Sequence, residues 1–245
     1  MEPVISVKHF KKSFGSKDVH KDVTFEVLPK ECLGLIGGSG QGKSVILRSL
    51  IGLEKPDSGE VLIEGEDITD YSEQKLVDIR KKVAYCFQNG ALFDSMTVFD
   101  NIAYPLREHT KLNEKSIKNK VLDILDDFGL TGNENTMPSE LSGGMQKRVG
   151  LARSIILGPK VILYDEPTAG LDPFNTILIQ ELILKLKNRG VTSVFVTHDM
   201  PSVFAVCDRI ILLAGGKIAA SGSAAELKKN PDGPLQNFIL GKRGF

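Results

Sequence analysis

The chain opens with short segments in which hydrophobic and polar positions alternate, as they do in half-buried β-strands. Residues 4–7 and 23–27 alternate in this way, and residues 32–36 form a continuous apolar run that stops at glycines. A helical pattern follows over residues 43–53, and a turn then leads into another strand at residues 60–64. The pattern predicts a β-rich N-terminal region.

The middle of the chain, between strand-like segments at residues 83–87 and 161–164, is helical. The clearest helix is predicted over residues 113–128, with Asn113 as its N-cap. Its apolar residues recur at helical spacing: Ile117, Val121, Ile124, Leu125 and Phe128. This block is a candidate helical subdomain.

Strands and helices alternate in the last third of the chain. Strands are predicted at residues 193–197 and 209–213, helices near residues 175–188 and 202–206, and a short terminal helix at residues 233–240. Alternation of this kind predicts a parallel sheet with helices on both faces.

Composition narrows the possible functions. A chain of 245 residues fits one large α/β domain or a domain with a smaller attached lobe. Because 31 Lys and Arg balance 31 Asp and Glu, no basic field favours nucleic acid as a partner. The start of the chain has no leader pattern, and no apolar run approaches the roughly 20 residues that cross a bilayer. We therefore expect a cytosolic polypeptide whose membrane role, if any, comes through a partner.

Most cysteines and histidines in the sequence carry no predicted chemistry. Cys32, Cys86 and Cys207 stand singly in apolar contexts, so we interpret them as small buried hydrophobic residues. His9, His20 and His109 are interpreted as surface residues or as side chains with satisfied hydrogen bonds.

Residues 37–44 match the phosphate-loop pattern G-x-x-x-x-G-K-[ST] without a mismatch, in the sequence GGSGQGKS. The match lies after a predicted buried strand and at the start of a predicted helix, where backbone N–H groups and the helix dipole bind phosphate. Lys43 would hold the β- and γ-phosphates, and the Ser44 hydroxyl would ligate Mg²⁺. The alternative is a glycine-rich turn with an exposed lysine.

A pair of acidic residues follows the predicted strand at residues 161–164. Because a carboxylate leaving a buried strand is costly without a partner, Asp165 is a candidate for holding the magnesium shell. Glu166 could orient the attacking water or accept its proton. Taken alone, the pair could instead be a polar strand end that caps a helix.

A second glycine turn, Leu-Ser-Gly-Gly at residues 141–144, precedes a predicted helix and would form a further anion site. It is similar to the signature motif of the ATP-binding cassette (ABC) ATPases, which the chain resembles over nearly its whole length. The resemblance implies an α/β P-loop NTPase fold with a RecA-like core, an N-terminal antiparallel β subdomain and an inserted helical subdomain. Residues 1–245 would form one ABC domain, with 1–88 and 159–245 as the core and 89–158 as the helical subdomain.

The resemblance also implies that two copies stack head to tail with ATP between them. One copy would contact ATP through Phe14, Gly37, Gly38, Ser39, Gly40, Gln41, Gly42, Lys43, Ser44 and Val45, and the other through Ser142, Gly143, Gly144 and Asp172.

The resemblance assigns the chemistry of the site residue by residue. Glu166, His198 and Gln88 would be catalytic, and Ser44, Gln88 and Asp165 would hold Mg²⁺.

Two of these assignments leave alternatives. Phe14, matched to the aromatic that stacks on adenine, could be an ordinary strand-end aromatic. His198, matched to the histidine that contacts the γ-phosphate, could be a structural residue at a strand end.

Two further segments, residues 91–106 and 145–153, resemble the ATPases of MCE-type (Mla) phospholipid transporters. Most other importers have glutamine where Met145 stands. This resemblance implies a permease docked near residues 88–99, an MCE-domain lipid-binding partner and a position on the cytoplasmic face of the inner membrane. The apolar side chains of residues 92–99 could instead only pack the helical lobe.

Other ABC classes compete with this assignment. A single cassette without a very long coiled coil argues against chromosome-type and translation-type members. The ATPase of another ABC importer or exporter, or a soluble ATPase of iron–sulfur cluster assembly, remains an alternative.

Overall fold

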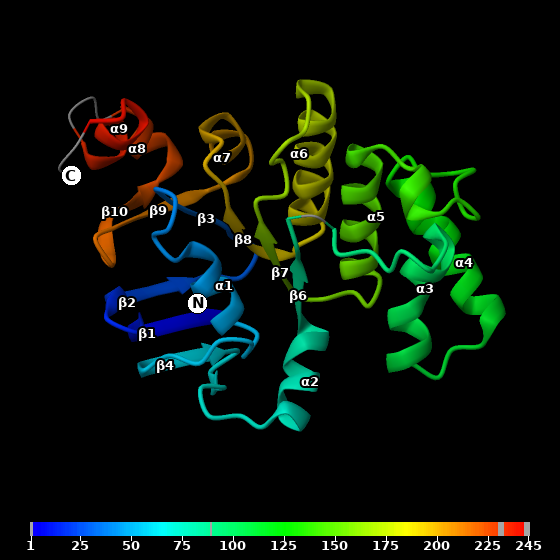
Figure 1. The fold of residues 1–245 in the computed structure, drawn as a ribbon, viewed down its shortest axis with the longest axis horizontal. Helices are drawn as coiled ribbons and strands as arrows, with labels where there is room; N and C mark the ends of the chain where they lie inside the picture. The colour runs from blue at the N-terminus through cyan, green and yellow to red at the C-terminus, as the bar shows by residue number, and fades with distance from the viewer. Residues whose placement is uncertain (1, 89, 230–232, 243–245) are drawn as a thin grey trace.

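Among the residues that the structure describes, one mixed sheet of ten strands forms the body of the protein (Figure 1). The computed structural model describes residues 2–88, 90–229 and 233–242. In sequence order the strands are β1 Ile5–Phe14, β2 Lys17–Val27, β3 Cys32–Gly37, β4 Ser58–Ile63, β5 Glu66–Asp67, β6 Val83–Cys86, β7 Val161–Asp165, β8 Thr192–Val196, β9 Arg209–Ala214 and β10 Lys217–Ser223. Their order across the sheet is β5-β4-β1-β2-β10-β9-β3-β8-β7-β6.

The sheet has a parallel half and an antiparallel half. Strand β3 pairs in parallel with β8 and β9, and β7 pairs in parallel with β6 and β8. The first strands are antiparallel: β1 pairs with β2 and with β4. The predicted parallel sheet and the β-rich start are both confirmed, and they belong to one continuous sheet.

The helices lie on both faces of this sheet. They are α1 Lys43–Ser49, α2 Glu73–Lys82, α3 Val98–His109, α4 Glu114–Asp127, α5 Gly143–Ile155, α6 Pro173–Asn188, α7 Met200–Val206, α8 Ala224–Lys229 and α9 Pro234–Ile239, with a 3₁₀ turn at Pro138–Glu140. Across the described ranges, none of them is both long enough and apolar enough to cross a bilayer.

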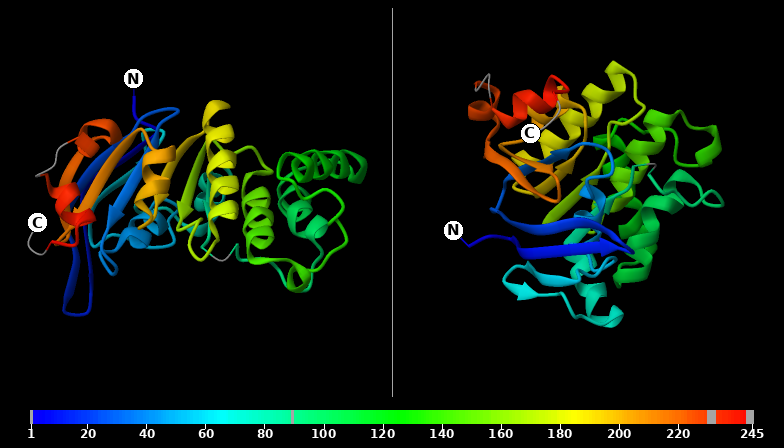
Figure 2. Two further views of the ribbon diagram at one scale, coloured as in Figure 1. Left: turned by 90° about the horizontal axis from the view of Figure 1, so that it is seen from above. Right: turned by 60° about the vertical axis from the view of Figure 1, so that its left-hand side comes forward.

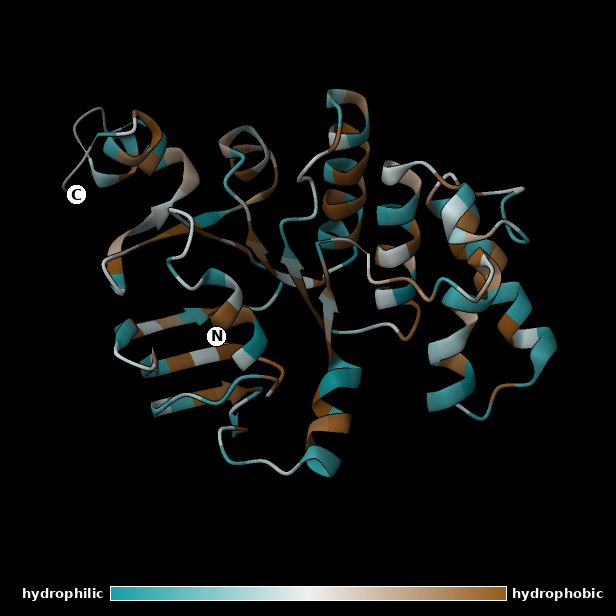
Figure 3. Ribbon diagram, in the orientation of Figure 1, coloured by the Kyte–Doolittle hydropathy of each residue, from teal (hydrophilic) through white to brown (hydrophobic). Residues whose placement is uncertain are grey.

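Alternating side chains of the central strands divide between two hydrophobic clusters. In β3, Cys32 and Ile36 belong to the cluster that includes α5, α6 and α7, whereas Leu33 and Leu35 belong to the cluster that includes α1 and α2. Because successive strand residues point to opposite faces, a fully apolar strand requires cover on both sides. The central strands are accordingly among the most hydrophobic segments in Figure 3.

Helices α3, α4 and α5 form a lobe at one end of the sheet (Figure 2). The N-cap predicted for α4 is present, since the Asn113 side chain accepts a hydrogen bond from the Ser116 amide. Asp127 at the end of α4 forms ion pairs with Lys185 of α6 and with Arg189, the C-cap residue of that helix. These pairs connect the lobe to a helix of the core.

Several details differ from the sequence-based expectations. Helix α1 ends at Ser49 rather than near residue 53, because the chain turns at Gly52, whose φ is +66°. Strand β10, with small and glycine residues, and helix α2 are not anticipated by the pattern.

The three cysteines are buried and free, as expected. Two of them are nevertheless neighbours, because the Sγ atoms of Cys32 and Cys207 lie 3.9 Å apart.

Candidate nucleotide-binding site

The phosphate loop joins buried strand β3 to helix α1. Gly40 and Gly42 both have positive φ, +75° and +82°, which a glycine adopts without strain. The Lys43 ammonium donates to the carbonyls of Gly37 and Gly38 at 2.8 and 3.1 Å. Burial lowers the pKa of Lys43, and the negative charges of Glu166 and Asp165 act in the opposite direction. A partly desolvated lysine among backbone amides suits an anionic phosphate.

The buried side chain of His20 packs against this loop, which corrects its interpretation as a surface or satisfied residue. The side chain is buried, and Nε2 donates to the Gly42 carbonyl at 3.1 Å. Within the described residues its Nδ1 has no hydrogen-bond partner, and burial lowers the pKa of the ring. A Cβ on Gly42 would lie 2.4 Å from Nε2, so the imidazole also fixes glycine at that position.

Asp165 at the end of β7 receives hydrogen bonds on both carboxylate oxygens. Ser44 Oγ donates to Oδ1 at 2.9 Å, and the Tyr85 hydroxyl donates to Oδ2 at 2.6 Å. Ser44 and Asp165, which are both predicted to hold Mg²⁺, are therefore in direct contact.

These two oxygen-bearing residues fit Mg²⁺. The ion prefers oxygen ligands and usually takes only one or two from the protein, with water and phosphate supplying the rest. Within the part of the chain that the structure describes, no three His, Cys, Asp or Glu side chains form a cluster that would favour another metal.

Glu166 and His198 come together as the sequence predicts. His198 Nδ1 lies 3.0 Å from Glu166 Oε2, and the Thr197 hydroxyl donates to the same oxygen at 3.1 Å. The His198 side chain is 71% exposed and that of Glu166 only 15%, so the imidazole faces the open side. Glu166 has a φ of +51°, a costly conformation for a non-glycine residue.

A cavity of about 600 Å³ connects these elements. Its lining includes Phe14, Ser39, Lys43, Ser44, Glu166 and His198. Phe14 is 47% exposed, with the Lys12 ammonium 5.2 Å from its ring centroid. The predicted aromatic therefore lies in the same cavity as the phosphate loop and Glu166.

The other predicted residues of the loop are divided between the lining and its support. Val45, Gly40 and Gly42 also line the cavity, whereas Gly37, Gly38 and Gln41 shape the loop behind it.

The glycine turn at residues 142–144 is not part of this cavity in the same chain. Ser142 caps α5 by accepting a hydrogen bond from the Met145 amide, and Ser142 and Gly143 are exposed. Figure 1 shows α5 on the far side of β7 and β6 from α1. An exposed helix N-terminus of this kind can bind an anion on another molecule.

Asp172 is also outside the cavity, at the N-cap of α6. Its carboxylate accepts hydrogen bonds from the backbone and side chain of Asn175 at 2.9 and 2.6 Å. A Cβ on Gly144 would lie 2.4 Å from Asn175 Oδ1. Asn175 therefore packs the Asp172 turn against the start of α5.

Gln88 lies in an exposed turn directly after β6. Strand register places Cys86 opposite Tyr164, so Gln88 emerges at the same sheet edge as Asp165. The side chain is not among those lining the cavity. Asn89, also within the segment proposed to dock a permease, is outside the described residues.

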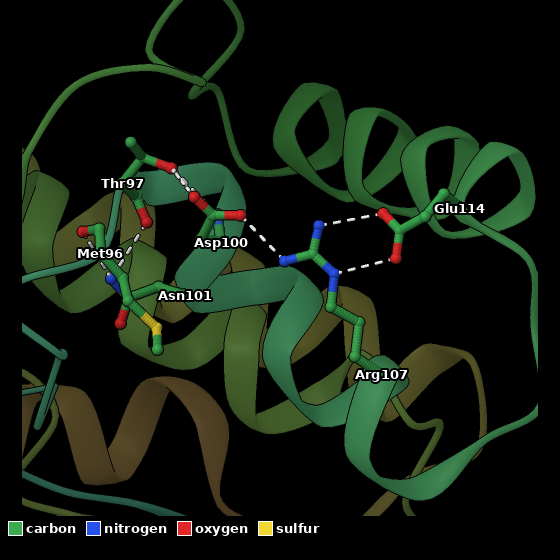
Figure 4. A network of polar contacts seen from close by, with 6 residues as sticks. All are labelled: Met96, Thr97, Asp100, Asn101, Arg107 and Glu114. Atoms are coloured by element: carbon green, nitrogen blue, oxygen red, sulfur yellow. Dashed lines mark hydrogen bonds and ion pairs between the residues drawn. The ribbon is translucent and has the colours of Figure 1, made fainter.

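The segment that follows Gln88 is held by Asn101, which is fully buried on α3. Its amide nitrogen faces the carbonyls of Phe93, Met96 and Thr97 at 3.0–3.1 Å, the last two of which appear in Figure 4. Arg153 of α5 donates to the Asn101 amide oxygen at 3.3 Å.

Arg153 also donates to the carbonyls of Gly90 and Ala91, at 3.1 and 2.8 Å. Helix α5 begins at the glycine turn of residues 142–144, and near its other end it contacts the segment that follows Gln88.

An open groove of about 310 Å³ lies between the lobe and the core. It is lined by residues that include Leu53, Arg80, Tyr85, Phe87, Pro105 and His109. Leu53 and Phe87 are 50% and 43% exposed, so this groove presents apolar surface beside Gln88.

Four residues of the site are not anticipated by the sequence pattern. Tyr85, Thr197 and His20 each donate a hydrogen bond to a predicted site residue, and Arg48 lines the cavity. Only Arg48 carries a local signal, because it follows Ser44 by one helical turn and its Nε donates to the Ser44 carbonyl at 3.2 Å.

Comparison with known families is consistent with this geometry. A family model for ABC transporters matches residues 20–169. The Escherichia coli K12 protein named intermembrane phospholipid transport system ATP-binding protein MlaF is 42% identical over 228 residues, which cover 93% of this chain and 85% of that protein. A Mycobacterium leprae protein named probable ribonucleotide transport ATP-binding protein mkl is 42% identical over 244 residues, covering 99% of this chain and 70% of that protein.

Solved structures give the same fold. A dimeric, post-hydrolysis state of the ATP-binding cassette MJ0796, bound to ADP and Pi, superposes with a TM-score of 0.83 at 30% identity, covering 90% of this chain and 98% of that one. The cbiO1 subunit of the Clostridium perfringens transporter complex cbiONQ gives a TM-score of 0.84 at 26% identity, covering 98% of this chain and all of that one.

Proposed function

The chain belongs to the ABC transporter family as an ATP-hydrolysing, ATP-binding subunit, and on this premise we propose that it powers phospholipid transport through a membrane permease. An MCE-domain protein would carry the lipid, and the subunit would lie on the cytoplasmic face of the inner membrane. The observation that carries this proposal is the 42% identity to MlaF over 93% of the chain.

The cavity supports the proposed roles of its residues in ATP hydrolysis. Lys43 and the loop amides would bind the phosphates, with the adenine against Phe14. Mg²⁺, held by Ser44, Asp165 and Gln88, would neutralise charge on the β- and γ-phosphates. Glu166 would accept a proton from the attacking water, and His198 would contact the γ-phosphate.

Two copies would be needed for a complete site. The exposed N-terminus of α5, with Ser142, Gly143 and Gly144, would bind the γ-phosphate held by the second copy, and Asp172 would lie at the seam. ATP would then close the dimer, and hydrolysis with phosphate release would open it.

The apolar groove beside Gln88 would receive a helix of the permease. Phe87 and Leu53 present apolar surface there, and Arg153 links the segment that begins with Gly90 to α5. A permease helix bound in the groove would thereby act on α5, whose N-terminal end would contact ATP.

The name of the mycobacterial relative supports a second candidate, ribonucleotide transport, at equal sequence identity. Reconstitution of the subunit with the permease encoded beside it separates the two. We expect ATP-dependent movement of a labelled phospholipid in proteoliposomes and none of a labelled ribonucleotide, with Glu166→Gln as the inactive control. The reverse preference would contradict lipid transport, and neighbouring iron–sulfur assembly genes in place of a permease would contradict transport altogether.

A further inference from the structure

Tyr85 lines the groove and also contacts Asp165 of the proposed nucleotide site. It lies on β6, which pairs in parallel with β7, and its hydroxyl reaches Asp165 Oδ2 at 2.6 Å. Its ring packs on Phe87, with ring centroids 4.4 Å apart, and both rings line the groove. One side chain therefore contacts both the acidic residue of the site and the wall of the groove.

The direction of the hydrogen bond is fixed by chemistry. An ionised carboxylate can only accept, so the Tyr85 hydroxyl donates. With Ser44 on Oδ1, the carboxylate is held from both sides.

Restraint of this kind matters for a metal ligand. Two carboxylate oxygens offer about four acceptor positions, and Ser44 and Tyr85 occupy one on each oxygen. The remaining acceptor positions would then be held in fixed directions, in which they could bind Mg²⁺ or its water. Partners that orient a ligand in this way typically contribute about 10- to 100-fold to metal affinity.

We propose that Tyr85 is a positioning residue that orients Asp165 and thereby sets the contribution of Mg²⁺ to ATP binding. The inference rests on the proposed function, because it takes the cavity to be an Mg–ATP site. Since the Tyr85 ring also forms part of the groove wall, a partner that packs on Phe87 would act on the metal ligand through one side chain.

The test compares Tyr85→Phe with Tyr71→Phe as a matched control. Tyr71 also donates its hydroxyl to a carboxylate, that of Glu66, but on the exposed surface near β5. Binding of a fluorescent, non-hydrolysable ATP analogue is measured in EDTA and in saturating Mg²⁺. The Kd in EDTA divided by the Kd in Mg²⁺ gives the contribution of the metal to binding.

We expect Tyr85→Phe to reduce this ratio by about 3- to 10-fold, at or below the lower end of the range for such orienting partners, because Mg²⁺ retains much of its water. Its Kd in EDTA should stay within about twofold of the wild-type value, and Tyr71→Phe should change neither quantity.

Each other outcome has a definite meaning. An unchanged or larger ratio in Tyr85→Phe overturns the proposal. Loss of binding in EDTA by that variant alone also overturns it, because Tyr85 would then have a general structural role. Failure of the wild-type chain to bind the analogue in either condition contradicts the proposed function instead.

Discussion

Hydrogen bonds to its backbone hold Glu166 in place. Its backbone amide donates to the Val196 carbonyl of β8, and its own carbonyl accepts from Ala169. These bonds keep the residue at a φ of +51°, which by itself costs on the order of 1–3 kcal/mol. The result is a carboxylate fixed between Thr197 and His198, facing the cavity.

Replacing Glu166 by Gln should separate binding from hydrolysis. The amide keeps the size of the side chain but cannot accept a proton from water, so we expect turnover to fall by at least about 100-fold. ATP binding should remain, and gel filtration with ATP should show a trapped dimer. Glu181→Gln, at an exposed position on α6, is the control. Undiminished turnover in Glu166→Gln would remove this residue from the proposed role.

Met145, which the sequence resemblance points to as a mark of the subfamily, is expected to pack rather than to take part in the chemistry. It is partly buried against the hydrophobic cluster of the lobe, and only its backbone amide reaches Ser142. We expect Met145→Gln to keep ATPase activity within about twofold, since a partly exposed substitution of similar size changes stability little. A collapse of activity measured by phosphate release would show that the thioether does more than pack.

At the level of single residues, the sequence predicted those whose chemistry is marked by a local motif. Ser44, Asp165, Glu166 and His198 all lie in one region as expected. Tyr85 could not be found in this way, because its contact with Asp165, 80 positions further along the chain, depends on β6 lying next to β7.

Between elements, Asp127 connects the helical lobe to the core. Its hydrogen bond with Lys185, and then that with Arg189, lowers the pKa of the carboxyl. The folded pKa is therefore below the unfolded one, so the ion pairs stabilise the fold above the unfolded pKa of about 3.9, and this contribution is lost as pH falls through the folded value.

Asp127→Asn should accordingly reduce stability at pH 7 and matter less in acid. Because the carboxylate is partly exposed, we expect a loss of at most about 1 kcal/mol in the free energy of unfolding. Urea unfolding at pH 7, 5 and 3.5 checks this, and the difference from wild type should shrink only between the last two values. A difference independent of pH would contradict the ion-pair explanation.

The contribution of Asn101 to holding the segment after Gln88 can be tested by substitution. Removal of its amide leaves the part-buried carbonyls of residues 93, 96 and 97 without that donor, and an unsatisfied buried group costs about 1–3 kcal/mol. We expect Asn101→Ala to lower the free energy of unfolding by at least about 1 kcal/mol, as measured by denaturant titration. Asn119→Ala, exposed on α4, should leave it unchanged or slightly raised.

Elements with a strong pattern were predictable, and those without one were not. β3 and β7 are continuous apolar runs, and α4 has regular spacing and a capping asparagine. β10 is rich in Ala, Ser and Gly, and β5 has two residues, so neither carries a periodic signal. Both exist because neighbouring strands supply backbone partners.

For the whole molecule, sheet topology determines which residues meet. Parallel strands β3, β7 and β8 end at one edge, so the loops that follow them bring Lys43, Glu166 and His198 to one cavity. The sequence predicted the alternation that produces this edge, but the strand order, with β10 and β9 between β2 and β3, could not be derived from periodicity.

The separation of the glycine turn at residues 142–144 from the cavity of its own chain has a genetic consequence. In the proposed dimer, a Lys43→Ala chain keeps a sound α5 N-terminus, and a Ser142→Arg chain keeps a sound phosphate loop. Each variant alone should be inactive, yet mixed pairs contain one complete site. Mixing the two purified variants should therefore restore measurable ATPase activity. At most about half of the sites in each mixed pair would be active. Two defective alleles would then complement each other within one cell.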